Sequence, residues 1–232
     1  MDLAKLIDHT YLKPNCNKAD VEQLCEEAIA HNFKAVCVPP IYVQFCAQKL
    51  EGQEVKVATV IGYPYGYSTT PSKVAEIQRA LDDGADELDV VINNCAVKDE
   101  NWNYVRNDID SMTRAAHLRG KVVKIIIETA LLSKNEMRKV CEICIESGVN
   151  FIKTSTGVLE GATVENITFL RQYLPDEIKI KASGGIRTGA QAEAMIAAGA
   201  NRIGTSNGIN IIQTIQKVVA DKSNDTGIEF DF

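Results

Sequence analysis

The chain has 232 residues, of which 45% are hydrophobic and 24% are charged. This balance is typical of a globular protein and excludes disordered, collagen-like and coiled-coil chains, and the length fits one α/β domain. The net charge is −6 and the 25 basic residues are scattered, so we expect no nucleic-acid partner. No stretch approaches eighteen apolar residues, and the N-terminus lacks a basic segment followed by an apolar one, so neither a membrane span nor a secretion signal is predicted.

The seven cysteines are an odd number in a long chain, which predicts free thiols in a reducing compartment and a cytoplasmic protein. Cys141 and Cys144 form a CxxC motif, but they lie in MRKVCEICIESG, a segment with helical periodicity. No second Cys/His pair follows at zinc-finger spacing. Both thiols are predicted to pack in the core, and no metal is expected.

Eight short segments rich in β-branched residues each predict a strand. They are residues 6–12, 34–40, 55–64, 86–93, 121–129, 150–157, 178–185 and 201–208. Segments with a period of 3.6 residues lie between them and predict helices. Examples are residues 18–32, 71–84, 133–148 and 190–200. Strands and helices thus alternate strictly, with about 29 residues per unit.

This alternation predicts an α/β fold, a single (β/α)8 or TIM barrel over residues 1–232. An open doubly wound sheet ranks second. The GxGxxG motif typical of that fold does not follow the first strand, and the number of predicted strands is eight, as in a barrel. Segments beginning at Gly84, Gly148 and Gly199 repeat one pattern, from a helix end through a glycine into a strand. Helix starts are predicted by the capping box of residues 133–136 and by Pro71. The polar residues from about 221 predict a loosely ordered tail.

Charged residues occur in segments that a barrel buries on both faces. Asp8, Asp89, Lys124, Lys153 and Lys181 each lie in a different predicted strand. Because side chains alternate along a strand, Lys153 and Lys181 can both point into the barrel, near the strand ends where barrel enzymes carry their active sites. A buried ion pair or a side chain reaching solvent explains any one lysine taken alone. Five charges together favour a functional cluster.

Such a cluster can act through a lysine amine. A lysine that is desolvated beside another cation has its charged form disfavoured, which leaves a free amine able to attack an aldehyde. The resulting Schiff base withdraws electrons from the adjacent carbon, and a carboxylate with a second lysine can move the protons. This chemistry indicates a metal-free aldolase. Lys179 points the same way as Lys181 but is expected to lie deeper, and it is assigned no catalytic role.

Three turns rich in small residues follow the last three predicted strands, at residues 154–157, 183–186 and 204–207. Their backbone amides can approach an anion closely, and barrels often bind phosphate at these strands. The turns therefore predict a phosphate site. Arg187 either adds a charge to that site or is a solvated loop residue.

The segments IDHTYLKP, AVCVPP, VIGYPYG, ELDVVIN, VVKIIIET, FIKTSTG, KASGGIR and RIGTS occur in this order over nearly the whole chain. In them the chain resembles the deoxyribose-phosphate aldolase family. The resemblance implies a TIM barrel that reversibly cleaves 2-deoxy-D-ribose 5-phosphate to D-glyceraldehyde 3-phosphate and acetaldehyde in deoxyribonucleotide catabolism. The reaction is implied to proceed through a lysine Schiff base without cofactor or metal. The apolar segment AVCVPPIYVQF favours a homo-oligomer, either a dimer or a tetramer.

The resemblance also implies roles for individual residues. Lys153 is implied as the Schiff-base lysine, Lys181 as the neighbouring cation that favours its free amine, and Asp89 as the proton donor or acceptor that works with Lys181. Residues implied to line the site and hold water or substrate hydroxyls are Asp8, Thr10, Lys124 and Thr156. Those implied around the phosphate are Gly157, Gly184, Gly185, Gly204 and Ser206. Cys37 is expected to border the site as a packing residue.

Other functions remain open from the residues alone. A different phosphosugar Schiff-base lyase or isomerase can use the same barrel. A strand lysine can hold pyridoxal phosphate, which a visible absorption band would reveal. A non-enzymatic phosphosugar sensor would use the lysines as anchors and form no covalent adduct.

Two positions depart from the family's pattern. Val158 stands where some members have a phosphate-binding lysine, so phosphate binding is expected to depend more on backbone amides. The chain ends in Phe232, whereas some members end in a tyrosine that assists proton transfer.

We therefore expect that removing residues 226–232 lowers turnover only mildly, because the tail lacks the tyrosine hydroxyl. A steady-state cleavage assay on the full-length and shortened chains tests this, and a large loss of turnover would refute it.

Overall fold

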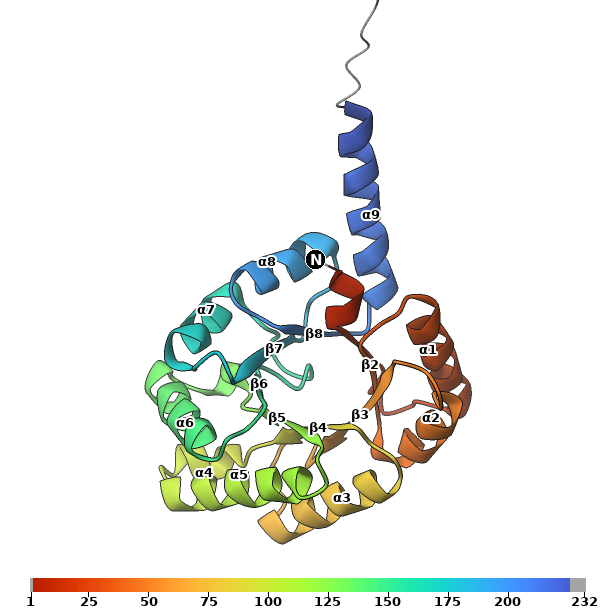
Figure 1. Cartoon of the computed structure of the whole chain (residues 1–232). Helices are drawn as coiled ribbons and strands as arrows, with labels where there is room; N and C mark the ends of the chain where they lie inside the picture. The colour runs from red at the N-terminus through yellow and green to blue at the C-terminus, as the bar shows by residue number, and fades with distance from the viewer. Residues whose placement is uncertain (1, 226–232) are drawn as a thin grey trace, which may run out of the picture.

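The computed structural model describes residues 2–225, with residues 217–225 described by their backbone. Eight parallel strands form a closed barrel in chain order, with β8 paired to β1 (Figure 1). The strands are β1 Ile7–Thr10, β2 Ala35–Val38, β3 Lys56–Ile61, β4 Glu87–Val91, β5 Val122–Ile126, β6 Phe151–Lys153, β7 Lys179–Ser183 and β8 Arg202–Thr205. The predicted (β/α)8 barrel is confirmed.

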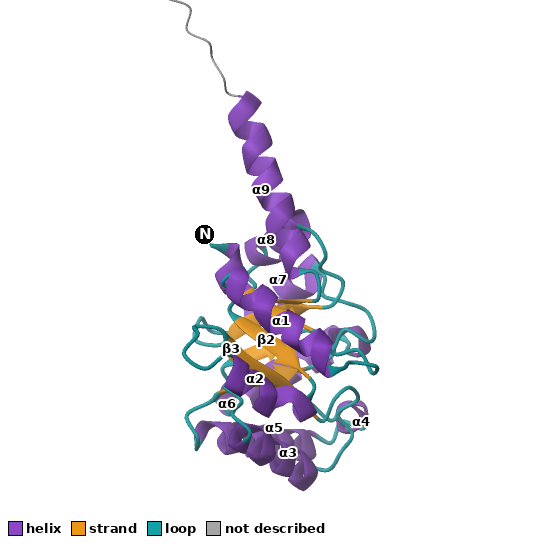
Figure 2. Ribbon diagram, turned by 90° about the vertical axis from the view of Figure 1, so that its right-hand side faces the viewer, coloured by secondary structure: helices purple, strands orange, loops and turns teal. Residues whose placement is uncertain are grey.

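Helices surround the barrel (Figures 1 and 2). They are α1 Lys18–Ala30, α2 Val43–Lys49, α3 Thr70–Asp82, α4 Asn94–Lys98, α5 Trp102–His117, α6 Lys134–Glu146, α7 Val164–Tyr173, α8 Gly189–Ala197 and α9 Gly208–Asp225. Short 3-10 helices are η1 Leu3–Leu6, η2 Pro40–Tyr42 and η3 Thr129–Leu131. The strict alternation of one helix per strand is wrong after β4, where both α4 and α5 precede β5.

All eight predicted strands are present, but they are shorter than the segments that predicted them. β6, for example, ends at Lys153 because the small polar residues and glycine that follow favour a turn. The predicted capping box is confirmed: Ser133 accepts from the backbone N–H of Glu136, whose carboxylate accepts from the N–H of Ser133. Pro71 lies in the first turn of α3, as predicted.

The polar tail predicted from about residue 221 begins inside α9, which continues to Asp225 and extends away from the barrel (Figure 2). Residues 226–232, whose removal we expect to have a mild effect, lie outside the described residues. Between residues 2 and 225, no helix is both long enough and apolar enough to cross a membrane.

Alternation along the strands divides the core into two parts. Apolar side chains on the outer faces, such as Leu88, Ile152 and Ile180, pack under the helices. Inside the barrel, a small apolar cluster fills the side formed by β2 and β3. It consists of Ala35, Cys37, Ala58 and Val60, with Leu12 and Tyr63 packed against it. The inner face of each of the other six strands carries at least one buried charged side chain.

One buried ion pair lies among the helices instead of in the barrel. The Lys73 ammonium on α3 is 2.8 Å from an Asp108 carboxylate oxygen on α5, and both side chains are fully buried. Lys73 also donates to the carbonyl of Val91 at the end of β4, over 2.9 Å. The pair therefore joins two helices to the strand that carries Asp89.

We expect Lys73→Met to lower the free energy of unfolding by about 3–5 kcal/mol, because it leaves the Asp108 charge buried without a partner. Urea unfolding measures this. The control is Lys139→Met, which removes an exposed pair with Glu142 and should cost less than about 1 kcal/mol. Equal small losses in the two variants would contradict the expectation.

Candidate active site

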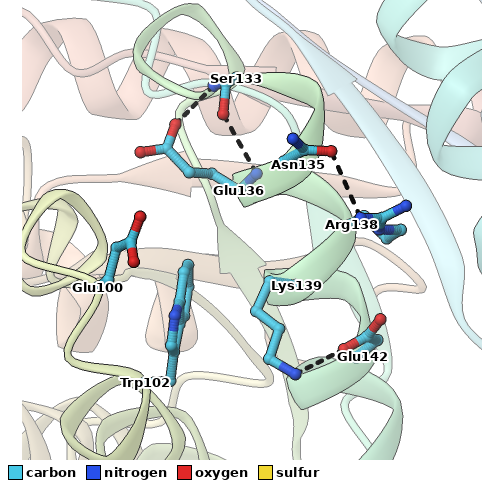
Figure 3. A pocket seen from close by; sticks show the side chains of 8 residues that line it. All are labelled: Glu100, Trp102, Ser133, Asn135, Glu136, Arg138, Lys139 and Glu142. Atoms are coloured by element: carbon cyan, nitrogen blue, oxygen red, sulfur yellow. Dashed lines mark hydrogen bonds and ion pairs between the residues drawn. The ribbon is translucent and has the colours of Figure 1, made fainter.

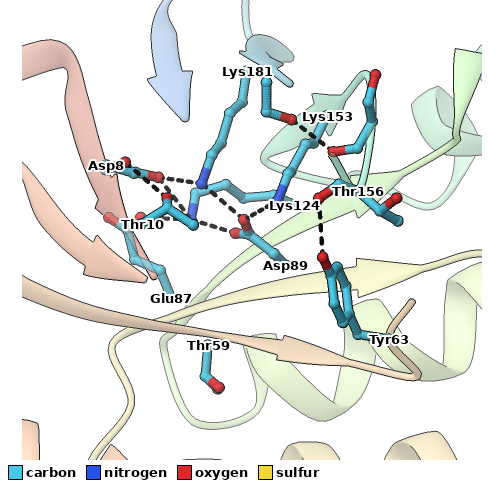
Figure 4. Close-up of polar contacts among 12 residues, drawn as sticks. Asp8, Thr10, Thr59, Tyr63, Glu87, Asp89, Lys124, Lys153, Thr156 and Lys181 are labelled. Carbon is cyan, nitrogen blue, oxygen red and sulfur yellow. Dashed lines mark hydrogen bonds and ion pairs between the residues drawn. The ribbon is translucent and has the colours of Figure 1, made fainter. Parts of the chain in front are cut away.

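Seven charged side chains point into the barrel, and each is at most 6% exposed. Figure 4 labels all of them except Arg202. They are Asp8 of β1, Glu87 and Asp89 of β4, Lys124 of β5, Lys153 of β6, Lys181 of β7 and Arg202 of β8. The predicted cluster of strand charges is therefore present, and it is larger than predicted. Six of these side chains, all except Lys153, form a closed ring of alternating positive and negative groups, which we call the charged ring.

Asp89 is the point at which three lysines meet (Figure 4). Its Oδ1 accepts from Lys124 over 2.7 Å. Its Oδ2 accepts from Lys181 over 2.7 Å and from Lys153 over 2.8 Å. The pairing of β6 with β7 sets Lys153 opposite Lys181, which brings both amines to the same carboxylate. Lys153 therefore contacts the charged ring through its hydrogen bond to Asp89.

The other half of the ring lies nearer the N-terminal ends of the strands. Arg202 donates through both terminal nitrogens to Glu87, over 3.2 Å each, and through one of them to Asp8. Asp8 also accepts from Lys181, and Glu87 lies 2.7 Å from the amine of Lys124. These contacts close the ring. It contains three cations and three carboxylates, so among these seven charges Lys153 is the one in excess of the ring's balance.

The ring holds Asp8, Asp89, Lys124 and Lys181 in their charged forms. Burial acts to raise the pKa of the Asp8 carboxyl, but Lys181 and Arg202 outweigh it and hold that pKa well below its usual range. Burial likewise opposes Lys124, Lys153 and Lys181 at Asp89, whose pKa is also held well below its usual range. Burial alone would lower the pKa of Lys181, yet Asp8 and Asp89 raise it. The pKa of Lys124 is raised in the same way, by carboxylates that outweigh burial.

A buried carboxylate outside the charged ring orders the loop after Lys153. Glu128, just beyond β5, accepts from the backbone N–H of Thr156 over 3.0 Å and from its hydroxyl. Glu128 has a φ of 55°, in the left-handed region that few residues other than glycine adopt. The Tyr63 hydroxyl donates to the Thr156 carbonyl over 3.2 Å (Figure 4). Burial raises the pKa of Tyr63 to about 12, so the hydroxyl stays a donor at neutral pH.

The three turns predicted to bind phosphate lie side by side. The N–H of Ala162, in the loop after β6, donates to the Ser183 carbonyl over 3.0 Å. A Cβ on Gly161 would lie 2.2 Å from the carbonyl oxygen of Gly184, so only glycine permits this approach. The hydroxyl of Thr205, the last residue of β8, donates to the Ile186 carbonyl over 2.7 Å. The loops after β6, β7 and β8 therefore form one continuous edge of the barrel.

The predicted phosphate residues differ in their surroundings. Gly157, Gly185 and Ser206 are exposed and Gly184 is half-buried, as an anion site at this edge requires. Gly204 is buried, and a Cβ there would lie 2.9 Å from Cε of Lys181. Its small size leaves room for that lysine, a role that the sequence analysis did not anticipate.

The remaining predicted residues lie at different depths. Asp8 and Lys124 are fully buried in the charged ring, whereas Thr10 is half-buried and donates to the Asp8 carbonyl. Lys179 is exposed at the start of β7, so the expectation that it lies deeper in the barrel than Lys181 is wrong. Cys37 packs in the apolar cluster on the other side of the barrel, where burial raises the pKa of its thiol.

Sequence reasoning missed three charged residues of this region. Glu87 and Arg202 are the first residues of their strands, where a charge is easily taken for one that reaches solvent. A signal was nevertheless present, because Glu87 stands two residues before Asp89 and alternation places both on the same face. Glu128 follows its strand, and its left-handed backbone is not evident from the sequence.

A separate groove of about 430 Å³ lies on the outer surface, along α6 and beside Trp102 (Figure 3). Its polar side chains pair with one another, as Lys139 does with Glu142 over 2.8 Å. It contains none of the predicted site residues.

Similarity to known proteins indicates the aldolase chemistry that the geometry of the site allows. A model described as "DeoC/LacD family aldolase" matches residues 3–214. The deoxyribose-phosphate aldolase of Thermococcus gammatolerans is 51% identical over 216 residues, which are 92% of this chain and 96% of that protein. The one of Staphylococcus epidermidis is 46% identical over 217 residues, 93% and 98% of the two chains. A solved tetrameric deoxyribose phosphate aldolase from Aeropyrum pernix has a TM-score of 0.87 and 32% identity, covering 93% of this chain and 92% of that one.

The depressed pKa of Asp8 predicts how stability depends on pH. Because the folded pKa lies below the unfolded value of about 4, the stabilisation is fully present above that value and is lost as the pH falls towards the folded pKa. We expect Asp8→Asn to be less stable at pH 7 and to lose about 2–3 kcal/mol less than the parent between about pH 5 and pH 2. Urea unfolding at several pH values measures this.

The control is Asp82→Asn, which alters an exposed carboxylate on α3 and should keep the parent's pH dependence. The buried His9, whose pKa is lowered by burial, is common to all three proteins and cancels in the comparison. Parallel curves for the parent and Asp8→Asn would show that Asp8 does not hold its charge through the ring.

Proposed function

The chain belongs to the DeoC/LacD aldolase family, and we propose that it is a deoxyribose-phosphate aldolase. It reversibly cleaves 2-deoxy-D-ribose 5-phosphate to D-glyceraldehyde 3-phosphate and acetaldehyde. The observation that carries the proposal is the position of Lys153: the last residue of β6, held by Asp89 and attached to a ring whose own charges balance. The names of relatives at 46–51% identity over nine-tenths of the chain support the substrate.

The charged ring explains how Lys153 acts as a nucleophile. With three cations and three carboxylates, the ring is neutral without Lys153, so a proton on that amine leaves one uncompensated charge in a desolvated site. The reaction requires the free amine, which adds no charge to this desolvated site. The amine attacks C1 of the open-chain aldehyde, and the carbinolamine loses water to give a protonated imine.

Asp89 and Lys181 then move the protons. A base removes the proton from the C3 hydroxyl, the C2–C3 bond breaks, and its electron pair passes into the imine to give an enamine. D-Glyceraldehyde 3-phosphate leaves, C2 takes up a proton, and water releases acetaldehyde from Lys153. Asp89 Oδ2 accepts from both amines, over 2.8 and 2.7 Å, so a proton can pass between Lys153 and Lys181 through one oxygen.

The other residues support these steps from different positions. Full burial of Asp8 and Lys124 favours a role in holding Lys181 and Asp89 in place over direct contact with substrate. Thr156, beside Lys153 and fixed by Glu128, is placed to meet a substrate hydroxyl. The exposed backbone amides of Gly157 and Gly185 bind the phosphate. Val158 is uncharged, so no side-chain charge at that position assists them.

We also propose that the protein works as a homo-oligomer in the cytoplasm. The exposed side chains of Ile41 and Tyr67, 82% and 64% exposed, are apolar surface of the kind that subunit contacts cover. The seven cysteines all lie within the described part of the chain and are free thiols there, which suits a reducing compartment.

Trapping the intermediate tests the proposed reaction. Incubation with acetaldehyde followed by borohydride should leave an ethyl group on Lys153, located by peptide mass spectrometry. Lys153→Ala should lose the adduct and lower kcat/KM for cleavage by more than about 1,000-fold. Lys153→Arg should fail equally, because a guanidinium stays protonated.

The matched control is Lys179→Ala, which removes an exposed lysine two residues before Lys181 and should keep both adduct and activity. No adduct on the folded parent protein would overturn the aldolase proposal and favour a sensor or an isomerase.

A further inference from the structure

We propose that Arg202 and Glu87 are positioning residues that set how readily Lys153 gives up its proton, acting through the charge balance of the ring and without touching substrate. The inference rests on the proposed role of Lys153 as the nucleophile. It assigns a function to a buried pair that the cleavage reaction itself does not use.

The side chains of the two residues make their hydrogen bonds and ion pairs within the charged ring. The Arg202 guanidinium donates to Glu87 and Asp8, and the Glu87 carboxylate accepts from Arg202 and Lys124. Both lie at the N-terminal ends of their strands, on the far side of Asp89 from the substrate end of the barrel. The Phe151 ring, on the same face of β6 as Lys153, lies 5.4 Å from the guanidinium and covers it.

The charge balance fixes the sign of each effect. Removing the Arg202 charge leaves two cations against three carboxylates, and a proton on Lys153 restores neutrality. Removing the Glu87 charge leaves three cations against two carboxylates, and a proton on Lys153 adds to the excess. A like charge disfavours protonation and an opposite charge favours it, so the two substitutions act in opposite directions.

Other titratable groups around Lys153 do not disturb this balance at neutral pH. Asp89 and Lys181 face it from β4 and β7, and the ring holds both charged. Cys37 faces it from β2, and burial raises the pKa of that thiol, which keeps it neutral. Tyr63, after β3, is neutral as well. Glu128, which accepts from the Thr156 N–H and hydroxyl, is the same in the parent and in every variant of the test below, so it does not enter the difference between them.

A purely structural role gives a different expectation. Buried ion pairs often contribute little net stability and can be replaced by apolar groups. If Arg202 and Glu87 only filled space, substitutions of similar size would change stability or the rate at every pH, but would not move the pH dependence of Lys153 in opposite directions.

The test compares four variants with the parent: Arg202→Met, Glu87→Gln, the double variant, and Arg202→Lys. The rate at which acetaldehyde and cyanoborohydride modify Lys153 is measured against pH, with the site identified by peptide mass spectrometry. Circular dichroism and urea unfolding establish that each variant is folded.

We expect the acidic limb of this profile to move up by about one pH unit in Arg202→Met and down by about one unit in Glu87→Gln, the scale of one buried unit charge. The double variant, with two cations and two carboxylates, should return to the parent's profile. Arg202→Lys keeps the charge and should also match it.

The inference would be overturned if the acidic limb of the pH profile did not move, or if it moved in the same direction in both single variants. Either result would leave the aldolase proposal standing. A parent protein that forms no adduct would overturn both. Should Arg202→Met not fold, the downward shift in Glu87→Gln and the unchanged profile of Arg202→Lys still decide the question.

Discussion

A charge inside a protein persists only where opposite charges and hydrogen-bond donors replace the water it has lost, and the barrel is arranged around this requirement. The charged ring meets it with members drawn from β1, β4, β5, β7 and β8, so each carboxylate joins strands that are far apart in sequence. Lys181 and Asp8 are 173 residues apart in the chain yet share a hydrogen bond. The closure of the barrel and the closure of the ring therefore depend on one another.

The apolar side of the barrel complements the charged side. β2 and β3 contribute small and apolar inner side chains, including Ala58 and Val60. They bring no competing charge to Asp89, and they lower the local polarity, which strengthens the interactions within the ring. Lys153 thus lies in a site of low polarity. Adding or removing one charge there changes the electrostatic energy far more than it does at a surface lysine in water.

The sequence contains most of the information needed to predict the fold, since eight β-branched segments separated by helical periodicity leave few alternatives to a closed parallel barrel. It also reveals Lys153, Lys181 and Asp89, because charges in doubly covered strands are rare. Depth and partners are harder to predict. Alternation along the strand places Lys179 and Lys181 on the same face, yet Lys179 is exposed and Lys181 is fully buried. Only the register between strands and the closure of the barrel distinguish them.

Arg202 shows why the second half of the ring escaped prediction and why it matters. Its charge stands at the start of a strand, where solvent is the ordinary neighbour. Its contact to Glu87 crosses the barrel, and its contact to Asp8 reaches the neighbouring strand β1. An apolar interior of the same volume would satisfy the fold as well, since buried ion pairs are seldom the most stable solution. The role proposed for the Arg202–Glu87 pair is therefore electrostatic. Without Arg202 and Glu87 the ring would still balance, with two cations and two carboxylates, but Lys124 and Asp8 would each lose a partner. The closed ring supplies those partners, and Lys153 is the charge that stands outside its balance.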